Sequence, residues 1–250
     1  MEALESTKAE APVAEKKPYL EVSSLRANYG HRQVLFDVSL NVGVGEIVAV
    51  FGHNGAGKTT MLNSIFGLVQ PAGGTVRCDG DDITGAACAR TVRKGMAYIA
   101  AENFVFGELS VLDNLKLGAH LESSRGLIRE RLRGVYELFP ILEERGSQVS
   151  STLSGGQQRM LSMGIALMSG PRLLLVDEPS LGLSPALVDQ VMEAIGRLAR
   201  EESMSVLLVE QNVVKTLPVV DRAYFVRSGR VILEESAEEL RQRDSYWELF

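Results

Sequence analysis

The sequence predicts an α/β fold in which helices cover both faces of a mostly parallel core sheet. Two short aliphatic segments, at 173–176 and 206–209, are separated by a segment of helical spacing at 185–200. Earlier in the chain, an apolar segment at 46–51 precedes a glycine-rich loop and a helix expected over 57–66. Strands that alternate with helices in this way are typical of a parallel sheet covered by helices.

Shorter strands are expected nearer the N-terminus, at 20–25, 34–40 and 75–78, and no helical segment separates the first two. This pattern predicts an N-terminal antiparallel β subdomain. A serine–glycine pair predicts the turn of a further hairpin over 222–233.

The chain is expected to form one domain over 19–250, preceded by a disordered lead. That lead, 1–18, is rich in alanine, glutamate and lysine. The segments 111–119 and 127–139 have helical spacing and no strand pattern. We therefore expect a small helical subdomain, at about 102–170, inserted in the core.

Composition limits the classes of function. The net charge of −6 and the sequence pI of about 5.3 argue against a general nucleic-acid binder. The chain has no apolar run of about 18 residues and no apolar stretch of the signal-peptide kind at its start, so we expect it to stay in the cytosol. Its two cysteines lack metal-site spacing and are expected to be reduced.

A phosphate-binding loop is the strongest motif. The pattern G-x-x-x-x-G-K-[ST] lies between an apolar strand and a helix, and a chance glycine-rich turn would not need this context. Glycines let backbone N–H groups turn toward phosphate oxygens, and the helix N-terminus adds partial positive charge. We expect Lys58 to bind the β- and γ-phosphates of ATP and Thr59 to ligate Mg²⁺, as in P-loop NTPases. The expected nucleotide-binding residues are Gly52, His53, Asn54, Gly55, Ala56, Gly57, Lys58, Thr59 and Thr60.

Two acidic residues follow the aliphatic strand at 173–176. The ends of strands are where open α/β sheets bind their ligands. Asp177 is expected to hold Mg²⁺, and Glu178, one residue further along and therefore pointing elsewhere, to polarise the attacking water. The alternative is that the two acids only end the strand and have no catalytic role. The presence of the phosphate loop in the same chain disfavours this alternative.

The residues before this strand carry a family resemblance. Ser154 suits the N-cap of a helix expected over 155–168, and the two glycines leave that helix N-terminus open to a phosphate. A capped helix after a glycine-rich turn would explain these residues locally, but not their place between the phosphate loop and the acidic strand. The stretch LSGGQ resembles the signature motif of ATP-binding cassette ATPases, which implies nucleotide binding by Ser154, Gly155, Gly156 and Gln157.

This resemblance implies a pair of subunits. In the family, the signature contacts the γ-phosphate of ATP on the opposite subunit, so that two chains enclose two ATP molecules head to tail. Tyr29 stands where the family carries an aromatic residue that stacks on adenine, although a tyrosine at a strand edge is the simpler alternative. Residues 180–183 (SLGL) match the loop that crosses the dimer interface.

The resemblance covers nearly all of 19–233 and is strongest for one subgroup, the shorter ATPase subunit of high-affinity branched-chain amino acid importers, with urea and short-amide relatives. The stretches 153–185 and 206–212 carry it. Like that subgroup, the chain has Gln211 where most cassettes have a histidine that contacts the γ-phosphate. Gln211 is therefore expected to join Glu178 as a catalytic residue, since its amide donates a hydrogen bond but carries no proton as imidazole does. An exposed polar residue after a strand is the alternative.

One position departs from the family. Most cassettes carry glutamine, and this subgroup usually glutamate, after the strand expected at 96–100, whereas this chain has Ala101 followed by Glu102. Alanine cannot ligate Mg²⁺. Either Glu102 takes over as a metal ligand after a small shift, or the contact is lost. In the family, this segment faces the membrane partner. The departure therefore leaves the identity of the transported solute undecided.

The whole pattern predicts an ATP-hydrolysing importer subunit at the cytoplasmic face of the inner membrane. The resemblance implies a second cassette ATPase (sister or self), two transmembrane permease subunits and, indirectly, an extracytoplasmic solute-binding protein, with a branched-chain amino acid, urea or an amide as solute and no nucleic acid. A repair-type ATPase is disfavoured because 60–152 lacks a long coiled coil, and a translation factor because there is one cassette. A weakly hydrolysing ATP-binding partner of a paired ATPase stays open because of Ala101.

Overall fold

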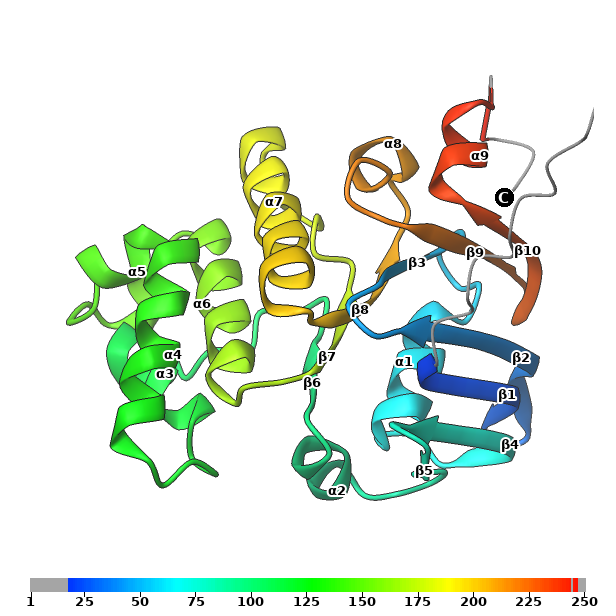
Figure 1. Ribbon diagram of the computed structural model, residues 1–250, viewed down its shortest axis with the longest axis horizontal. Coiled ribbons are helices and arrows are strands. Elements are labelled where there is room, and N and C mark those ends of the chain that lie inside the picture. The colour runs from blue at the N-terminus through cyan, green and yellow to red at the C-terminus, as the bar shows by residue number, and fades with distance from the viewer. Residues whose placement is uncertain (1–17, 244, 247–250) are drawn as a thin grey trace, which may run out of the picture.

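The computed structural model describes residues 18–243, 245 and 246, and these fold into a core sheet with a smaller sheet on one side and a group of helices on the other (Figure 1). The predicted α/β class, with a mostly parallel core sheet, is confirmed. Apart from Pro18, the lead predicted at 1–18 lies outside the described residues. In the part of the chain that the structure describes, no helix is long and apolar enough to cross a membrane.

The core sheet has six strands. All neighbouring pairs run parallel except the hairpin of β9 and β10 at one edge, which forms around the predicted serine–glycine turn. Strands β3, β7 and β8 are buried along their whole length, as strands must be when both faces of a sheet are covered. From edge to edge the strands are β10 (Arg230–Ser236), β9 (Arg222–Arg227), β3 (Ile47–Phe51), β8 (Ser205–Glu210), β7 (Leu173–Asp177) and β6 (Met96–Ile99).

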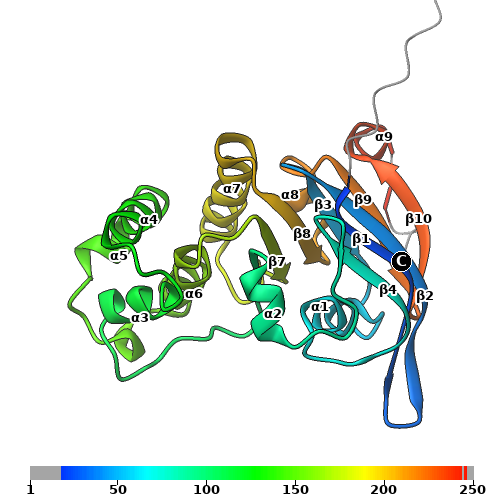
Figure 2. The same cartoon turned by 60° about the horizontal axis from the view of Figure 1, so that its bottom comes forward.

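The predicted antiparallel β subdomain is also confirmed. It is a four-stranded sheet that lies beside α1, and Figure 2 shows its longest hairpin extending away from the helices. In order across the sheet, its strands are β2 (Arg32–Gly43), β1 (Pro18–Tyr29), β4 (Pro71–Cys78) and β5 (Asp81–Asp82).

Helices α3 to α6 follow one another between β6 and β7 and form the group on the left of Figure 1, with α7 beside them. They occupy the place of the helical segment expected at about 102–170, whose standing as a separate subdomain stays a prediction. The helices are α1 (Lys58–Phe66), α2 (Cys88–Arg93), α3 (Val111–Gly118), α4 (Arg125–Leu138), α5 (Pro140–Glu144), α6 (Gly155–Met168), α7 (Pro185–Glu202), α8 (Val213–Thr216) and α9 (Ala237–Arg241), with a 3₁₀ turn, η1 (Ser150–Thr152).

Two hydrophobic clusters cover the two faces of the core sheet. Successive side chains of β3 alternate between them, with Ile47, Ala49 and Phe51 in the cluster shared with α6 and α7, and Val48 and Val50 in the cluster shared with α1 and the antiparallel sheet. The carboxyl ends of the parallel strands are therefore held rigidly between two packed layers, and the functional residues lie there.

Candidate nucleotide site

The phosphate loop connects β3 to α1. Gly57, the N-cap of α1, has a φ of 103°, which favours glycine, and no side chain caps the helix. The first N–H groups of α1 thus lack a side-chain partner and are suited to bind an anion. Gly52 is needed for another reason, because a Cβ there would lie 2.4 Å from the carbonyl oxygen of Val226. Within the loop, the side chains of His53, Asn54 and Thr59 are exposed, whereas Ala56 and Thr60 are buried.

Lys58 begins α1 with a side chain that is only 4% exposed. Its ammonium donates to the carbonyl oxygens of Gly52 at 2.8 Å and His53 at 3.2 Å. It also forms an ion pair with Glu178, with Nζ 3.4 Å from Oε1. The three protons of the ammonium therefore have three oxygen partners, and the charge is fixed at the opening of the loop.

Asp177 is the last residue of β7 and is almost completely buried. Burial raises the pKa of its carboxyl group above the ordinary value, and a hydrogen bond with the Thr59 side chain opposes that shift. Tyr98 donates from its hydroxyl to Oδ2 of Asp177 across 3.4 Å, whereas Oδ1 is buried without a partner. A buried carboxylate oxygen without a donor, beside a threonine hydroxyl, is a suitable pair of ligands for a hard cation such as Mg²⁺.

Glu178 has different side-chain partners from Asp177: whereas Asp177 contacts Tyr98, Glu178 contacts Lys58 and Gln211. Its φ of 42° lies in the left-handed region that few non-glycine residues adopt, and its N–H donates to the carbonyl oxygen of Val209. The Gln211 amide nitrogen lies 3.0 Å from Oε1 of Glu178 and 2.6 Å from Oδ1 of Asn54. The structure thus brings the phosphate loop, both acids and Gln211 together at one edge of the sheet.

Glu210, which the sequence analysis overlooked, supports this arrangement. It ends β8, is buried, and accepts the backbone N–H of Ser180 at 2.9 Å and of Gln211 at 3.0 Å. One carboxylate therefore joins the loop expected to cross the dimer interface to the residue expected to contact the γ-phosphate. An acidic residue at the end of an aliphatic strand was the only signal for it.

The signature residues lie apart from the phosphate loop, at the start of α6 among the helices on the left of Figure 1. Ser154 is the N-cap, as predicted, and it forms a capping box with Gln157. Gly155 has open space around it, but Gly156 is buried, and a Cβ there would lie 2.3 Å from Leu187 of α7. Of the two glycines expected to leave the helix end open, only Gly155 does so; Gly156 allows α6 and α7 to pack closely.

Two further predicted site residues are exposed. Tyr29 ends β1 with 52% of its surface accessible. Glu102 forms no hydrogen bond or ion pair with another residue in the described part of the chain. Its neighbour Asn103 donates to the carbonyl oxygen of Gly155 at 3.1 Å, so this loop contacts the signature. A metal-binding role for Glu102 stays a prediction.

Arg159 is a second residue that the sequence analysis overlooked. It lies on α6 with 1% of its surface exposed, and it donates to the carbonyl oxygens of Ala100, of Ala101 at 3.3 Å and of Asp177 at 2.9 Å. Burial lowers the pKa of this guanidinium, while the carboxylates of Asp177 and Glu210 oppose the shift. The loop that lacks the expected side chain at Ala101 is thus tied to the site through its backbone.

A phosphate loop with a buried lysine, a strand that ends in two acids, and a helix with an open N-terminus define a P-loop ATPase. The ABC transporter family model matches residues 35–181. The chain is 41% identical over 231 residues to the high-affinity branched-chain amino acid transport ATP-binding protein BraG of Pseudomonas aeruginosa, a match that covers 91% of this chain and 98% of that protein. The chain therefore belongs to the ABC transporter family and is one of its ATPases.

Further relatives and solved structures are consistent with this family and its fold. The lipopolysaccharide export system ATP-binding protein LptB of Escherichia coli is 36% identical over 225 residues, covering 89% of this chain and 92% of that one. A solved ATP-binding subunit of an ABC transporter has a TM-score of 0.81 at 29% identity, covering 92% and 99% of the two chains. An ATP-binding cassette in its ADP conformation has a TM-score of 0.82 at 23% identity over 94% and 98%, which shows the shared fold.

Proposed function

We propose that this chain energises an importer for branched-chain amino acids or a related small polar solute such as urea or an amide. The observation that carries the proposal is the 41% identity, over nearly the whole of both chains, to a protein named for branched-chain amino acid transport. A relative from Archaeoglobus fulgidus with a name of the same kind, LivF, is 35% identical over 230 residues. The Gln211 that the sequence analysis associated with this subgroup lies in the site beside Glu178.

In this proposal Thr59 and Asp177 hold Mg²⁺, which supplies positive charge to the phosphate oxygens when bound. Lys58 binds the β- and γ-phosphates. Glu178 takes a proton from the attacking water on a carboxylate oxygen, and the Gln211 amide donates to the γ-phosphate. Tyr29, exposed at the end of β1, stacks on the adenine.

A second ATPase subunit completes each site. Ser154, Gly155 and Gln157 at the open end of α6 serve the γ-phosphate of the ATP on the other subunit, in a head-to-tail dimer with a sister or a second copy. Two features support this. The signature has no hydrogen bond or ion pair to its own phosphate loop among the described residues, and Leu181, in the loop after Glu178, is 59% exposed.

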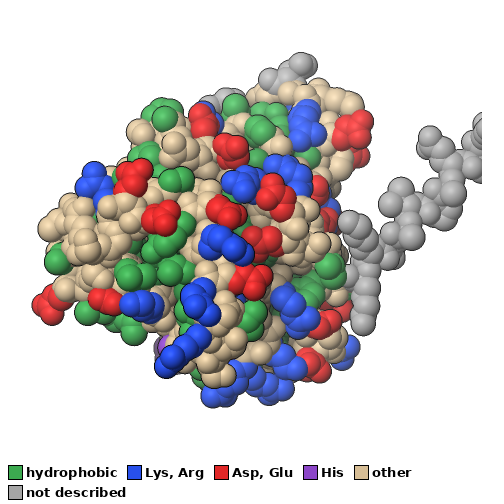
Figure 3. All heavy atoms as spheres, turned by 60° about the vertical axis from the view of Figure 1, so that its left-hand side comes forward, with side chains coloured by type: hydrophobic (Ala, Val, Ile, Leu, Met, Phe, Trp, Pro, Cys, Tyr) green, Lys and Arg blue, Asp and Glu red, His purple; other side chains and the backbone are tan. Residues whose placement is uncertain are grey.

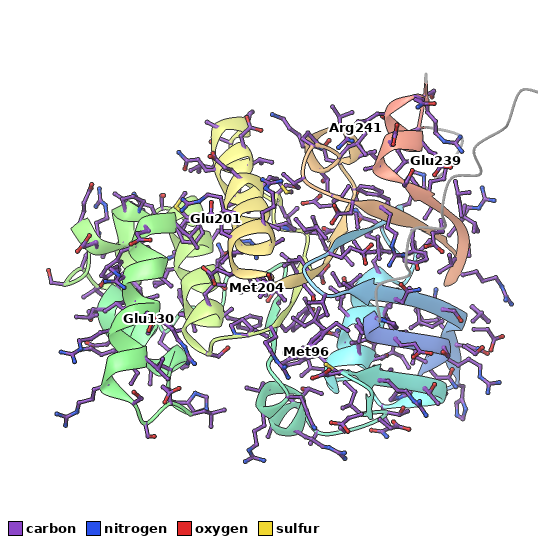
Figure 4. The ribbon with its side chains drawn as sticks, in the orientation of Figure 1. Met96, Glu130, Glu201, Met204, Glu239 and Arg241 are labelled. Carbon is purple, nitrogen blue, oxygen red and sulfur yellow. The ribbon has the colours of Figure 1, made fainter. Side chains whose placement is uncertain are left out.

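A groove between the core and the helices fits a membrane partner. It has a volume of about 540 Å³ and is lined mainly by apolar side chains, among them Phe66, Val92, Phe106 and Leu117. Met96 of β6, labelled in Figure 4, also lines this groove. We infer that a permease subunit inserts an apolar segment here, with two permeases for two ATPases and an extracytoplasmic binding protein beyond them.

The charge around this groove supports a peripheral place at the cytoplasmic face of the inner membrane. Figure 3 shows lysine and arginine side chains gathered along the lower edge of the molecule, the edge at which α2 lies in Figure 1. Helix α2 carries Arg90 and Arg93 in its last turn, and both are exposed. Basic side chains beside a membrane-facing groove favour contact with anionic lipid headgroups.

The test is reconstitution in lipid vesicles with the two permease subunits of the proposed importer. We expect the permeases and a loaded binding protein to raise ATP hydrolysis, and labelled leucine, urea or an amide to accumulate only with ATP. Vesicles that contain Lys58→Ala are the matched control. A rate of ATP hydrolysis that the permeases do not change, but that DNA or ribosomes raise, would favour the non-transport alternatives. Stimulation by lipopolysaccharide instead would favour the second candidate, an export function like that of the LptB relative.

A further inference from the structure

The Gln211 amide nitrogen is shared between two acceptors on different parts of the site. It lies 2.6 Å from Oδ1 of Asn54, in the phosphate loop, and 3.0 Å from Oε1 of Glu178, after β7. A side-chain amide nitrogen carries two hydrogens, so each acceptor receives one. A histidine nitrogen carries at most one and could not serve both. Serving both Asn54 and Glu178 from one nitrogen therefore depends on the residue being glutamine rather than histidine.

The same oxygen of Glu178 also faces Lys58. Oε1 lies 3.4 Å from the Lys58 ammonium and accepts from Gln211 as well. The other two partners of Lys58 are backbone carbonyl oxygens of the phosphate loop. A phosphate oxygen that binds Lys58 must replace one of these three partners. The side chain of Glu178 is the partner that can move without breaking the loop, and its negative charge competes most directly with phosphate.

We propose that Asn54 is a positioning residue for ATP hydrolysis: it accepts one proton of the Gln211 amide and thereby aims the other at Glu178, holding the glutamate on Lys58 until phosphate displaces it. Once displaced, Glu178 is released from the lysine with both of its oxygens available to water. Gln211 remains anchored on Asn54, with its second N–H directed into the space beside the phosphate loop. The inference rests on the ATPase activity and is independent of the solute.

Binding of ADP tests the contact between Asn54 and Gln211 separately from any contact with the γ-phosphate. ADP lacks the γ-phosphate to which Gln211 is expected to donate, but its β-phosphate still needs Lys58. The proposed measurement is the affinity of the full chain for ADP, determined by titration calorimetry without Mg²⁺. Asn54→Ala and Gln211→Ala should each bind ADP about threefold more tightly, because Glu178 is no longer held on the lysine. The double variant should bind no more tightly than either single variant, since both remove the same contact. Glu178→Gln, which removes the competing charge, should also tighten ADP binding.

Hydrolysis provides the second measurement. At saturating ATP, Asn54→Ala should lower kcat about fivefold without raising KM, and it should add nothing when Gln211 is already alanine. The sharpest control is the Gln211→His background, in which one N–H cannot serve both acceptors. There, Asn54→Ala should change ADP affinity by less than about 1.5-fold. Weaker ADP binding by Asn54→Ala, or effects that multiply in the double variant, would overturn the proposal and make Asn54 an independent phosphate-loop residue.

Discussion

The guanidinium of Arg159 donates to the carbonyl oxygen of Asp177 across 2.9 Å, and this contact joins the helix that begins with the signature to the strand that ends in the acids. The same side chain donates to the carbonyl oxygens of Ala100 and Ala101 in the loop after β6. In the described residues it has no carboxylate within ion-pair distance, and its Nε is buried without a partner. The loop, the signature helix and the acidic strand are therefore linked through one buried cation.

We predict that Arg159→Met lowers the free energy of unfolding by about 3 kcal/mol, because it leaves up to three carbonyl oxygens without this donor in a buried place. Arg159→Lys keeps the charge but reaches fewer acceptors, and should lose about half as much. Urea denaturation measures both. The exposed Arg129→Met on α4 is the matched control and should change stability by less than about 0.5 kcal/mol. Equal stability for Arg159→Met and the control would show that the buried contacts contribute nothing.

We predict that Lys58→Ala abolishes tight binding of MgATP, since it removes the side-chain charge that we expect to bind the β- and γ-phosphates. Titration with a fluorescent ATP analogue measures the affinity. Arg26→Ala, an exposed change on β1, should bind as wild type does. An affinity of Lys58→Ala within about threefold of wild type would contradict the phosphate-loop assignment.

We predict that Glu178→Gln binds ATP but hydrolyses it at least about 100-fold more slowly, because an amide cannot accept the proton of the attacking water. The variant should also accumulate as a closed dimer with ATP, which size-exclusion chromatography would detect. Asp189→Asn, which changes an exposed acidic residue on α7, is the control and should keep the wild-type rate. Hydrolysis by Glu178→Gln near the wild-type rate would mean that another group orients the water.

The long elements of the fold could be predicted from sequence because their patterns are repeated and local. The helix expected over 155–168 has those bounds in the structure, and Met160, Met163 and Met168 on it are buried in the core. The short helices α2, α5 and α8 escaped prediction because four to six residues are too few to show a helical period. Helix α9 did carry a signal, the capping-box pattern from Ser236 to Glu239, which was overlooked.

The residues of the site likewise differ in how far the sequence alone could indicate them. Roles for residues within a continuous motif, such as Lys58 and Asp177, could be proposed from the sequence because chemistry and spacing coincide. Arg159 could have been suspected, since it is four residues before the buried Met163 and therefore on an apolar face of α6. The contact between Asn54 and Gln211 could not be predicted, because 157 positions separate the two residues and only the fold brings them together.

We predict that Tyr29→Ala weakens the binding of ATP and GTP alike by about 1–2 kcal/mol, because stacking on a purine face tolerates either base. Tyr29→Phe keeps the ring and should bind both nucleotides as wild type does. Competition for a fluorescent nucleotide measures the two affinities. Wild-type affinity in Tyr29→Ala would support the simpler view of an exposed tyrosine at a strand edge.

The last prediction concerns the loop at Ala101, where the family carries a polar side chain. We predict that Glu102 has taken over, so that Glu102→Ala lowers ATP hydrolysis about tenfold in the assembled transporter, in line with the loss of a charge near the metal. Glu102 is exposed and has no hydrogen-bond or ion-pair partner in the described part of the chain, so its carboxylate is available to a ligand. Arg159 holds the backbone on one side of it and Asn103 contacts Gly155 on the other, which limits the shift to the side chain itself.

The measurement is the rate with the permeases present, because the loop adjoins the groove assigned to them. Glu102→Gln removes the charge but keeps the size of the side chain, and it should lose nearly as much activity as Glu102→Ala. In both variants, the Mg²⁺ concentration for half-maximal activity should rise. Ala101→Gln should change little, since the role is already filled. If instead Glu102→Ala is silent and Ala101→Gln raises the rate, the contact has been lost, and this chain provides the less active of two paired ATP sites.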